Sequence, residues 1–342
     1  MGKRVIAVVH NVPVPSGHAF SEASLDVLTQ VEAVENALMQ LGYATVRIAF
    51  TRDVSGFIQR IREEKVDMAF NLCETVDENP RFAGHPAAVL ELLGISFSGS
   101  SSMALMLTTD KILTKRLLIA KGIRTPNYLI CNGTHKFNPR ILRFPVIVKP
   151  RFEDASIGID QDSIFQDEGE FRKGIGEFFK RFGTLLVEEY ITGREFNVSL
   201  FGYPSPSVLP AAEIDFSGFP KDLYPIVGYR AKWDIGSFEY QNTPRKFLLK
   251  LPNAIKKRIE NTALESFRIL MLRDYGRVDM RLDSRGRVHI LEVNANPCLS
   301  PDAGFVAAAK KDGMTYSDIV KELVNFIEHR SRNNENKASH IS

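Results

Sequence analysis

Alternation between strand-like and helix-like segments near the N-terminus limits the fold more than any other feature of this sequence. Residues 4–9, RVIAVV, are apolar and β-branched, which is typical of a buried parallel strand. Apolar residues then recur at helical spacing from Glu22 to Leu41, and Gly42 is placed to end that helix. The alternation continues through ATVRIAF (strand), GFIQRIREEK (helix), VDMAFNL (strand) and PAAVLELLG (helix). The pattern predicts an α/β domain with a doubly wound parallel sheet over about residues 1–100.

The rest of the chain has a different pattern. RFPVIVKP predicts a strand and RFEDASIGID a loop of small residues, while TLLVEEYI predicts a strand with EFNVSLFG as its hairpin partner. Residues 214–246 are rich in Gly, Pro and aromatic residues without a clear period, and a loop of that length is usually a functional flap or a disordered segment. A helix at about 253–272, a hairpin and an amphipathic helix follow, and the polar tail is predicted to be disordered.

Composition excludes several classes of protein. The 342 residues are 44% hydrophobic and 25% charged, as in a globular protein of two or three domains. The net charge is only +3 and no basic stripe stands out, so we expect no nucleic-acid partner. No apolar run reaches the ~18 residues of a membrane span, and the N-terminal segment does not resemble a signal peptide. Three scattered cysteines indicate reduced thiols and a cytoplasmic protein.

A polar pair stands out in the segment HILEVNANP, residues 289–297. Glu292 and Asn294 lie two residues apart in an otherwise apolar run, so on a strand both side chains project from one face. The preceding segment, RVDMRLDSRGR, predicts the other strand of a hairpin with a two- or four-residue turn at its Arg-Gly pair. That register places Asp279 opposite Glu292 and Arg277 opposite Asn294, with opposed Cβ atoms ~5 Å apart.

Two carboxylates at that spacing repel each other unless a cation lies between them. Asp, Glu and Asn oxygens suit a hard ion, and Mg²⁺ usually takes one or two carboxylates and completes its shell with phosphate and water. Arg277 beside them is suited to phosphate or a developing oxyanion. The alternative is a solvated hairpin face whose acids pair with Arg277 and Arg281. The apolar flank favours the metal interpretation, because buried carboxylates need a partner.

Upstream segments offer groups for a nucleotide. Lys149 ends the strand FPVIVK and is held extended by Pro150, as suits a phosphate-binding lysine, although such lysines are often merely solvated. The small residues of the following loop, EDASIG, let backbone N–H groups approach a phosphate. Glu188 and Glu189 end the strand TLLVEE, which indicates either a surface edge or hydrogen bonds to a ribose or adenine. The chain contains no Walker motif and no GxGxxG.

Taken together, seven collinear segments over about residues 66–305 resemble the D-alanine:D-alanine ligase family of the ATP-grasp superfamily. They are LELLGISFSGSSSMALMLTTDK, RFPVIVKP, ASIG, VEEYITGREFNV, AKWD, GRVDMRLD and ILEVNANP. The resemblance implies an α/β (α+β) ATP-grasp fold with an N-terminal doubly wound parallel-sheet domain at 1–105. It further implies a central ATP-grasp subdomain with a glycine-type phosphate loop at 106–210, a C-terminal subdomain with flap and Mg²⁺ site at 211–330, and a disordered tail at 331–342.

The family chemistry implied is a two-step ligation. The carboxylate of one amino acid attacks the γ-phosphate of ATP to give an acyl phosphate and ADP, and the amine of the second then attacks the acyl carbon. The implied cofactors are ATP and two Mg²⁺ ions, with Mn²⁺ as an alternative, and the partners are small amino-acid substrates and a second copy in a homodimer.

The resemblance also implies a role at each matching position. Those roles are phosphate binding by Lys111, Lys149 and Ser156, adenine contacts along Glu188, Glu189 and Ile191, ribose binding by Glu195, a flap lysine at Lys232, metal binding by Asp279, Glu292 and Asn294, and transition-state stabilisation by Arg277.

The sequence departs from the family where the substrate is expected to bind. The family's N-terminal Glu-His pair is replaced by HNVPVPSGHAFSEASLD, in which Glu22 is the only candidate to hold the first substrate's ammonium. The alternative interpretation of Glu22 is an ordinary glutamate in the first turn of a helix, where a negative charge is favourable. The family's Leu-His-Gly becomes NLCE, the tyrosine after the flap lysine becomes Trp233, and Pro-Gly-Met becomes PCL, in which the backbone N–H of Cys298 still suits an oxyanion.

Three hypotheses follow. The first is a D-alanine–D-alanine ligase or close relative in peptidoglycan precursor synthesis, and the second is a dipeptide or peptide-tailoring ligase with other substrates. The third is a non-catalytic nucleotide-binding protein, against which the intact set Asp279, Glu292 and Asn294 argues.

Overall fold

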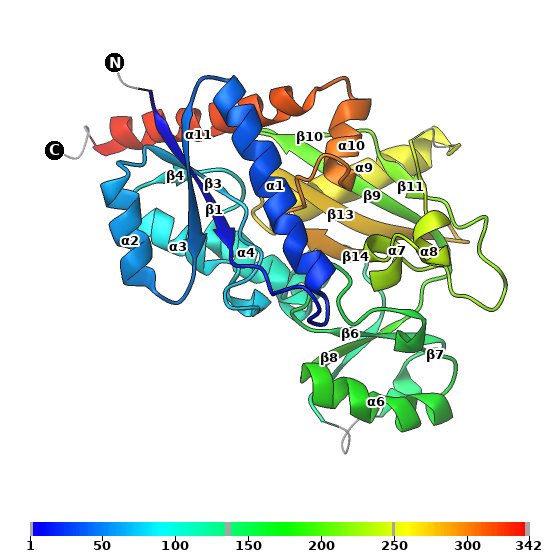
Figure 1. Cartoon of the computed structure of the whole chain (residues 1–342). Helices are drawn as coiled ribbons and strands as arrows, with labels where there is room; N and C mark the ends of the chain where they lie inside the picture. The colour runs from blue at the N-terminus through cyan, green and yellow to red at the C-terminus, as the bar shows by residue number, and fades with distance from the viewer. Residues whose placement is uncertain (1–2, 134–137, 248–249, 339–342) are drawn as a thin grey trace.

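The first of three sheets is parallel. The computed structural model describes residues 3–133, 138–247 and 250–338, and its first sheet has the strand order β2-β1-β3-β4 (Figure 1). Its elements are β1 (Val5–Asn11), α1 (Ser21–Gln40), β2 (Ala44–Phe50), α2 (Val54–Glu63), β3 (Met68–Asn71), α3 (His85–Leu92) and β4 (Ser96–Phe97). Ala7 and Val9 of β1 face the core that contains α2 and α3, while Ile6 and Val8 face the core that contains α1. Helices therefore cover both faces of the sheet, and the predicted doubly wound parallel arrangement is confirmed.

The second sheet is small and antiparallel, with the strand order β5-β8-β6-β7. Helices α4 and α5 lead into it from the first sheet, and α6 covers one of its faces, at the bottom of Figure 1. Its elements are α4 (Ser102–Thr109), α5 (Lys111–Ala120), β5 (Tyr128–Cys131), β6 (Val146–Pro150), β7 (Ile164–Phe165), α6 (Glu168–Phe182) and β8 (Leu185–Glu189). Short 3-10 turns at Pro80–Phe82, Pro139–Ile141 and Gln161–Ser163 complete the connections in these two parts.

The third sheet has the strand order β12-β11-β9-β13-β14, with β10 added beside β9. Its strands are β9 (Gly193–Gly202), β10 (Ser207–Val208), β11 (Ala212–Ile214), β12 (Arg245–Lys246), β13 (Asp274–Asp283) and β14 (Val288–Asn294). Its helices are α7 (Tyr229–Trp233), α8 (Phe238–Gln241), α9 (Asn253–Ile269), α10 (Gly304–Lys311) and α11 (Tyr316–Ala338).

The predicted hairpin between TLLVEEYI and EFNVSLFG is wrong. Strand β8 pairs with β5 and β6, whereas β9 pairs with β13 along its whole length. Residues 190–192 carry the chain out of the second sheet and into the third. Most of β9 is buried, so it is suited to the interior of a sheet that packs on both faces rather than to an edge hairpin.

The end of the chain also differs from expectation. The sequence assigned residues 331–342 to a disordered tail, but α11 continues to Ala338, and residues 339–342 lie outside the described residues. An ion pair between Arg332 and Glu328, one turn apart, supports this last part of the helix. Helix α11 packs beside α1 on the first sheet, and Arg4, just before β1, pairs with Glu328 of α11 at 2.8 Å (Figure 1).

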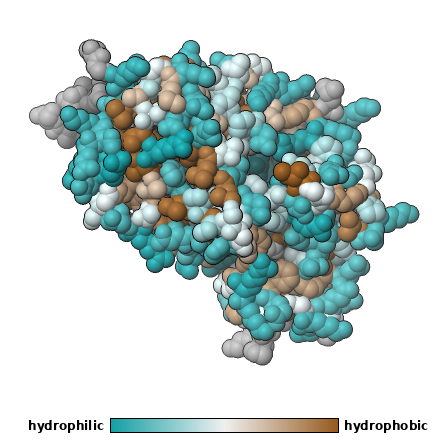
Figure 2. Space-filling view, in the orientation of Figure 1, coloured by the Kyte–Doolittle hydropathy of each residue, from teal (hydrophilic) through white to brown (hydrophobic). Residues whose placement is uncertain are grey.

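Polar residues cover most of the face shown in Figure 2, and apolar residues form only small separate groups on it. Within the described ranges, no helix has both the length and the apolar character needed to cross a membrane.

Candidate active site

A cavity of about 680 Å³ lies between the three sheets and collects most of the residues singled out by the sequence. The predicted residues that line it are Lys149, Ser156, Glu188, Glu189, Ile191, Glu195, Lys232, Arg277, Asp279, Glu292 and Asn294. Two predicted residues, Lys111 and Glu22, are not part of the lining. Long strands of the third sheet form one wall, and the small sheet forms the opposite one.

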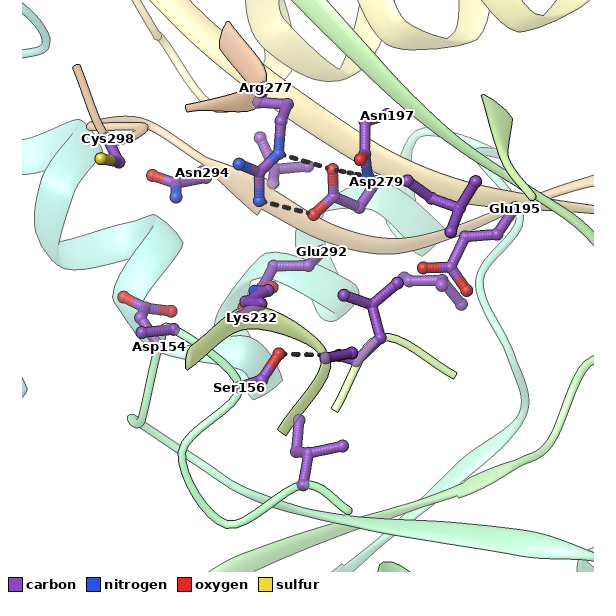
Figure 3. Close-up of a pocket in the computed structure, with 18 of the residues that line it drawn as sticks. Asp154, Ser156, Glu195, Asn197, Lys232, Arg277, Asp279, Glu292, Asn294 and Cys298 are labelled. Atoms are coloured by element: carbon purple, nitrogen blue, oxygen red, sulfur yellow. Dashed lines mark hydrogen bonds and ion pairs between the residues drawn. The ribbon is translucent and has the colours of Figure 1, made fainter. Parts of the chain in front are cut away.

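The predicted opposition of acids across the hairpin is confirmed. Asp279 pairs with Glu292, and Arg277 pairs with Asn294. Figure 3 shows these four side chains grouped around one space. The sequence did not predict the strand on the other side of β13, which places Asn197 of β9 opposite Asp279. The only local signal for Asn197 is its spacing of two residues from Glu195, which puts both on one face of a strand.

The acids of this group are already paired with cations. Both carboxylate oxygens of Asp279 accept hydrogen bonds from Arg277 at 2.8 Å, and Asn197 Nδ2 donates to Asp279 Oδ1 at 2.8 Å. Glu292 Oε1 lies 3.1 Å from Lys111 Nζ. Burial pushes the pKa of Glu292 upward, but Lys111, Lys232 and Lys149 outweigh burial and lower that pKa to about 2. Glu292 is therefore charged at neutral pH.

The donor set fits a divalent metal that takes part of its coordination from phosphate. Among the residues that the structure describes, no group of three or more His, Cys, Asp and Glu side chains is arranged to hold a metal alone. Asp279 and Glu292 supply two carboxylates and Asn294 an amide oxygen, all on one side of the cavity. Hard oxygen donors in that number suit an ion such as Mg²⁺, which keeps several water or phosphate ligands rather than a complete protein cage.

Lys111 lies behind these acids rather than in the cavity. It is the first residue of α5 and is buried, with Nζ near Glu292 and 3.3 Å from Asp154 Oδ1, and it also donates to the carbonyl of Glu153. Burial alone would lower the pKa of Lys111, but Glu292 and Asp154 raise it above its usual value. Lys111 therefore holds Glu292 and Asp154, in the loop after β6, in place.

The wall formed by the small sheet carries a buried charge cluster. Glu188, which is fully buried, pairs with Lys149 at 2.7 Å and with Lys115. Burial raises the pKa of Glu188, but Lys115 and Lys149 outweigh it, so this pKa is lowered and the group is charged. The side chain of Glu188 thus fixes Lys149 at the strand end, and it is turned toward lysines rather than toward a ribose or adenine.

The other acids at this end are also paired. Glu189 accepts from Arg143 Nη2 at 2.7 Å, and Glu195 accepts from Arg281 Nε at 2.9 Å. Glu195 nevertheless lines the cavity, as does the backbone around Ile191.

The segment predicted as a flap contains the short helices α7 and α8 and lies over the cavity (Figure 1). Several hydrogen bonds hold it down. Among them, Ser156 Oγ donates to Val227 O at 2.8 Å, Trp233 Nε1 to Ala155 O at 2.9 Å, and the Tyr229 hydroxyl to Glu22 Oε2 at 3.0 Å. Glu22 therefore ties α1 to the flap instead of facing the cavity.

The flap lysine is directed at the hairpin group (Figure 3). Burial and the neighbouring Arg277 lower the pKa of Lys232, and Glu292 and Asp279 act against them. Lys232 therefore brings a cation from the flap to the side of the cavity where the acids of the hairpin lie.

Four acids of the lining were not identified from the sequence, and one of them, Asp302, is exposed to solvent. Asp26 comes from α1, Glu74 follows β3, and Asp154 lies in the loop after β6. They belong to segments far apart in the chain, so no local spacing connects them.

Comparisons with known proteins agree with this geometry. Residues 120–325 match the family model described as D-ala D-ala ligase C-terminus. The D-alanine–D-alanine ligase of Carboxydothermus hydrogenoformans is 32% identical over 303 residues, which cover 86% of this chain and 90% of that protein. An uncharacterised protein of Sinorhizobium fredii is 34% identical over 265 residues, or 77% of this chain and 75% of that one.

The fold matches solved structures over nearly its whole length. The crystal structure of the Bacillus anthracis D-alanine–D-alanine ligase complexed with ATP superposes with a TM-score of 0.76 at 22% identity, covering 97% of this chain and 99% of that one. The fold and the sequence matches therefore agree. The chain belongs to the D-alanine–D-alanine ligase family, whose members are ATP-dependent carbon–nitrogen ligases.

Proposed function

We propose that this chain is a D-alanine–D-alanine ligase or a close relative, which joins two amino acids in the synthesis of peptidoglycan precursors. One observation carries the proposal: a single cavity has Lys149 and the Glu188–Ile191 segment on one wall and the Arg277, Asp279, Glu292 group on another. ATP binding along the first wall brings its γ-phosphate toward the hairpin acids, where an amino-acid carboxylate is activated.

Asp279, Glu292 and Asn294 are the residues that would hold the divalent metal, which we propose to be two Mg²⁺ ions, with Mn²⁺ as a substitute. When bound, the ions neutralise charge on the phosphates and on the transferring phosphoryl group. The pairing of Asp279 with Arg277 supports this role, because its two hydrogen bonds of 2.8 Å fix the carboxylate and the guanidinium side by side at the cavity.

Cations of the chain take the remaining charge. Lys149 would bind the nucleotide phosphates from the rigid end of β6, and the loop that contains Ser156 would cover them. Arg277 would stabilise the charge that develops on the acyl group, together with the backbone N–H of Cys298. The closed flap, with Lys232 directed inward, would keep water from the acyl phosphate.

A second candidate keeps the chemistry and changes the amino acids. The substrate side of the cavity has Cys298, Trp233 and the acids Asp26 and Glu74 in its lining. These residues favour a ligase for which at least one of the two joined substrates is not D-alanine, as in a dipeptide or peptide-tailoring ligase.

We also propose that the protein is cytoplasmic, as expected from its reduced thiols and its use of ATP. A homodimer is proposed from the family resemblance alone.

The test is phosphate release and dipeptide formation with ATP and Mg²⁺ across a panel of D- and L-amino acids. We expect release with D-alanine, and product that contains two joined residues. Release only with other amino acids would favour the second candidate. ATP binding without release on any panel member would contradict the ligase and favour a protein that acts by binding nucleotide.

A further inference from the structure

Two acids in the cavity lining have no cationic partner. Six of the nine acids that line the cavity lie within 4 Å of a lysine or arginine: Asp154, Glu188, Glu189, Glu195, Asp279 and Glu292. Asp302 is exposed to solvent. That leaves Asp26 and Glu74, which are half-buried and have no ion pair with any residue in the described part of the chain.

Neutral donors hold these two carboxylates in place. The buried amide Gln30 Nε2 donates to Glu74 Oε1 at 3.0 Å and to Asp26 Oδ2 at 3.3 Å, so the two acids share one fixed group. The Ser300 hydroxyl donates to Asp26 Oδ1 at 2.8 Å, and the Cys298 thiol donates to Asp26 Oδ2 at 3.0 Å. Their negative charge is therefore oriented but not neutralised.

The position of the pair identifies what it faces. Cys298 and Asn294 lie on the side of Arg277 away from Glu195, as Figure 3 shows. Asp26 contacts Cys298, so the acidic pair lies on that side as well. The proposed metal ligands Asp279 and Glu292 therefore lie between this pair and the end of the cavity proposed to bind the nucleotide. Phosphates would be repelled there, so the complementary group is a cation of the amino-acid substrate.

We propose that Asp26 and Glu74 form a cation-binding subsite that selects an amino acid with a side-chain ammonium as one of the two substrates joined. This inference rests on the proposed ligase function. The α-ammonium of a neutral amino acid compensates one negative charge, whereas a diamino acid supplies two cations to an acidic pair that makes no ion pair in the described part of the chain.

The ionisation of Glu74 adds a pH signature. Burial raises the pKa of Glu74 to about 7; the Gln30 hydrogen bond and Lys232 of the flap lower it, while Asp26 on α1 and Asp154 on the phosphate loop raise it. A bound ammonium favours the deprotonated carboxylate, so the affinity for a cationic side chain rises as pH increases through about 7. A neutral side chain gains nothing from that ionisation.

The experiment compares ornithine with norvaline, its uncharged counterpart of nearly equal length, each as both enantiomers and with D-alanine as the other substrate. We expect the wild-type protein to have a kcat/KM for one ornithine enantiomer at least tenfold above that for norvaline. Asp26→Asn and Glu74→Gln should each lower kcat/KM for ornithine far more than kcat/KM for norvaline, and so remove most of this ratio. Because the ratio is measured within each variant, a misfolded fraction cancels.

Matched controls come from the same segments. Glu32→Gln on α1 and Glu78→Gln after β3 remove exposed carboxylates outside the cavity, and both should keep the wild-type ratio. Calorimetry with ornithine and norvaline in the presence of ADP and Mg²⁺ gives the same comparison without turnover, at pH 6 and pH 8.

Two outcomes overturn the inference: equal kcat/KM for ornithine and norvaline in the wild type, or variants that lose both substrates together, which would limit the acids to the α-ammonium. If no amino acid supports phosphate release, the proposed function fails. Calorimetry then still decides this inference. It is supported if the wild type binds ornithine more tightly than norvaline and Glu74→Gln removes the difference. It is contradicted if the wild type binds the two amino acids equally.

Discussion

At the residue scale, Glu292 has two properties that matter for the site: it is close to three lysines, and it projects from a strand into a cavity. Burial disfavours its charge, but the lysines keep its pKa near 2. A carboxylate that is ionised at neutral pH and lines the cavity is suited to a metal ion. Its partner across the hairpin, Asp279, pairs with Arg277 at 2.8 Å.

Glu292→Gln should therefore abolish ligation without unfolding the protein. The amide keeps the size of the side chain but removes the charge that a divalent ion needs, so we expect phosphate release to fall by at least about 100-fold. Phosphate release at saturating ATP measures the loss, and circular dichroism checks the fold. Glu265→Gln, an exposed position on α9, is the control and should be fully active. Wild-type activity in Glu292→Gln would remove this residue from the metal site.

Local patterns could predict the hairpin acids but not the acids of the substrate end. Asp279 and Glu292 follow from strand alternation and hairpin pairing, which act over a few residues. Asp26 and Glu74 come from α1 and from the loop after β3, and only the packing of the first sheet against the third brings them near Cys298. Lys115 was missed for the same reason, since its partner Glu188 is distant in sequence.

At the element scale, two errors in the predicted hairpin cancel. The turn is a three-residue loop with Gly286 at φ 71°, not a loop of two or four residues, and this alone would place Leu291 opposite Asp279. A bulge between Met280 and Asp279 restores the predicted pairing with Glu292. Lys115 Nζ lies 3.3 Å from the carbonyl of Leu291, the extra residue of the bulge. No feature of the sequence indicates this bulge.

The flap shows a second limit of sequence patterns. Helices α7 and α8 have only five and four residues, too few for a helical period to appear, so the segment was predicted as a loop. Its function as a cover is visible in the contacts of residues such as Tyr229, Trp233 and Val227 with segments outside the flap.

Tyr229→Phe should loosen the flap while leaving the residues that line the reacting end intact. The change removes the hydrogen bond to Glu22 but keeps the ring, which lies 4.9 Å from the ring of Phe20 in an edge contact. Losing this hydrogen bond should reduce the free energy that favours the closed flap by about 1 kcal/mol. That corresponds to roughly a fivefold rise in ATP hydrolysed per dipeptide formed, because water reaches the acyl phosphate more often.

The ratio of phosphate to dipeptide measures this uncoupling. Tyr43→Phe is the matched control, because the Tyr43 hydroxyl also donates to a carboxylate, that of Glu328, but far from the flap. An unchanged ratio in Tyr229→Phe, or an equal change in Tyr43→Phe, would show that the bond to Glu22 does not control closure.

At the scale of the whole molecule, a buried ion pair joins the first sheet, the third sheet and the last helix. Asp274, the fully buried first residue of β13, accepts from Arg330 of α11 and from the backbone N–H of Gly99, which follows β4. Arg330 also donates to the carbonyl of Phe97 at 2.6 Å. The sequence predicted neither partner, because the two residues are 56 positions apart and belong to different elements. This cluster fixes how the N-terminal sheet is placed against the sheet that carries the hairpin acids.

Arg330→Ala should lower the free energy of unfolding by about 3–5 kcal/mol, since it leaves the carboxylate of Asp274 buried without its cation. Burial already raises the pKa of Asp274, and removing Arg330 takes away the main effect that opposes this rise. Arg332→Ala, two residues later, removes an exposed pair with Glu328 and should change stability by no more than about 0.5 kcal/mol. Urea unfolding followed by circular dichroism measures both.

Because the pair also aligns the two sheets around the cavity, the Arg330→Ala protein should show a higher KM for its amino-acid substrates while it is still folded. A loss of stability with an unchanged KM would mean that the alignment of Asp26 and Glu74 with Arg277 depends on other contacts between the sheets.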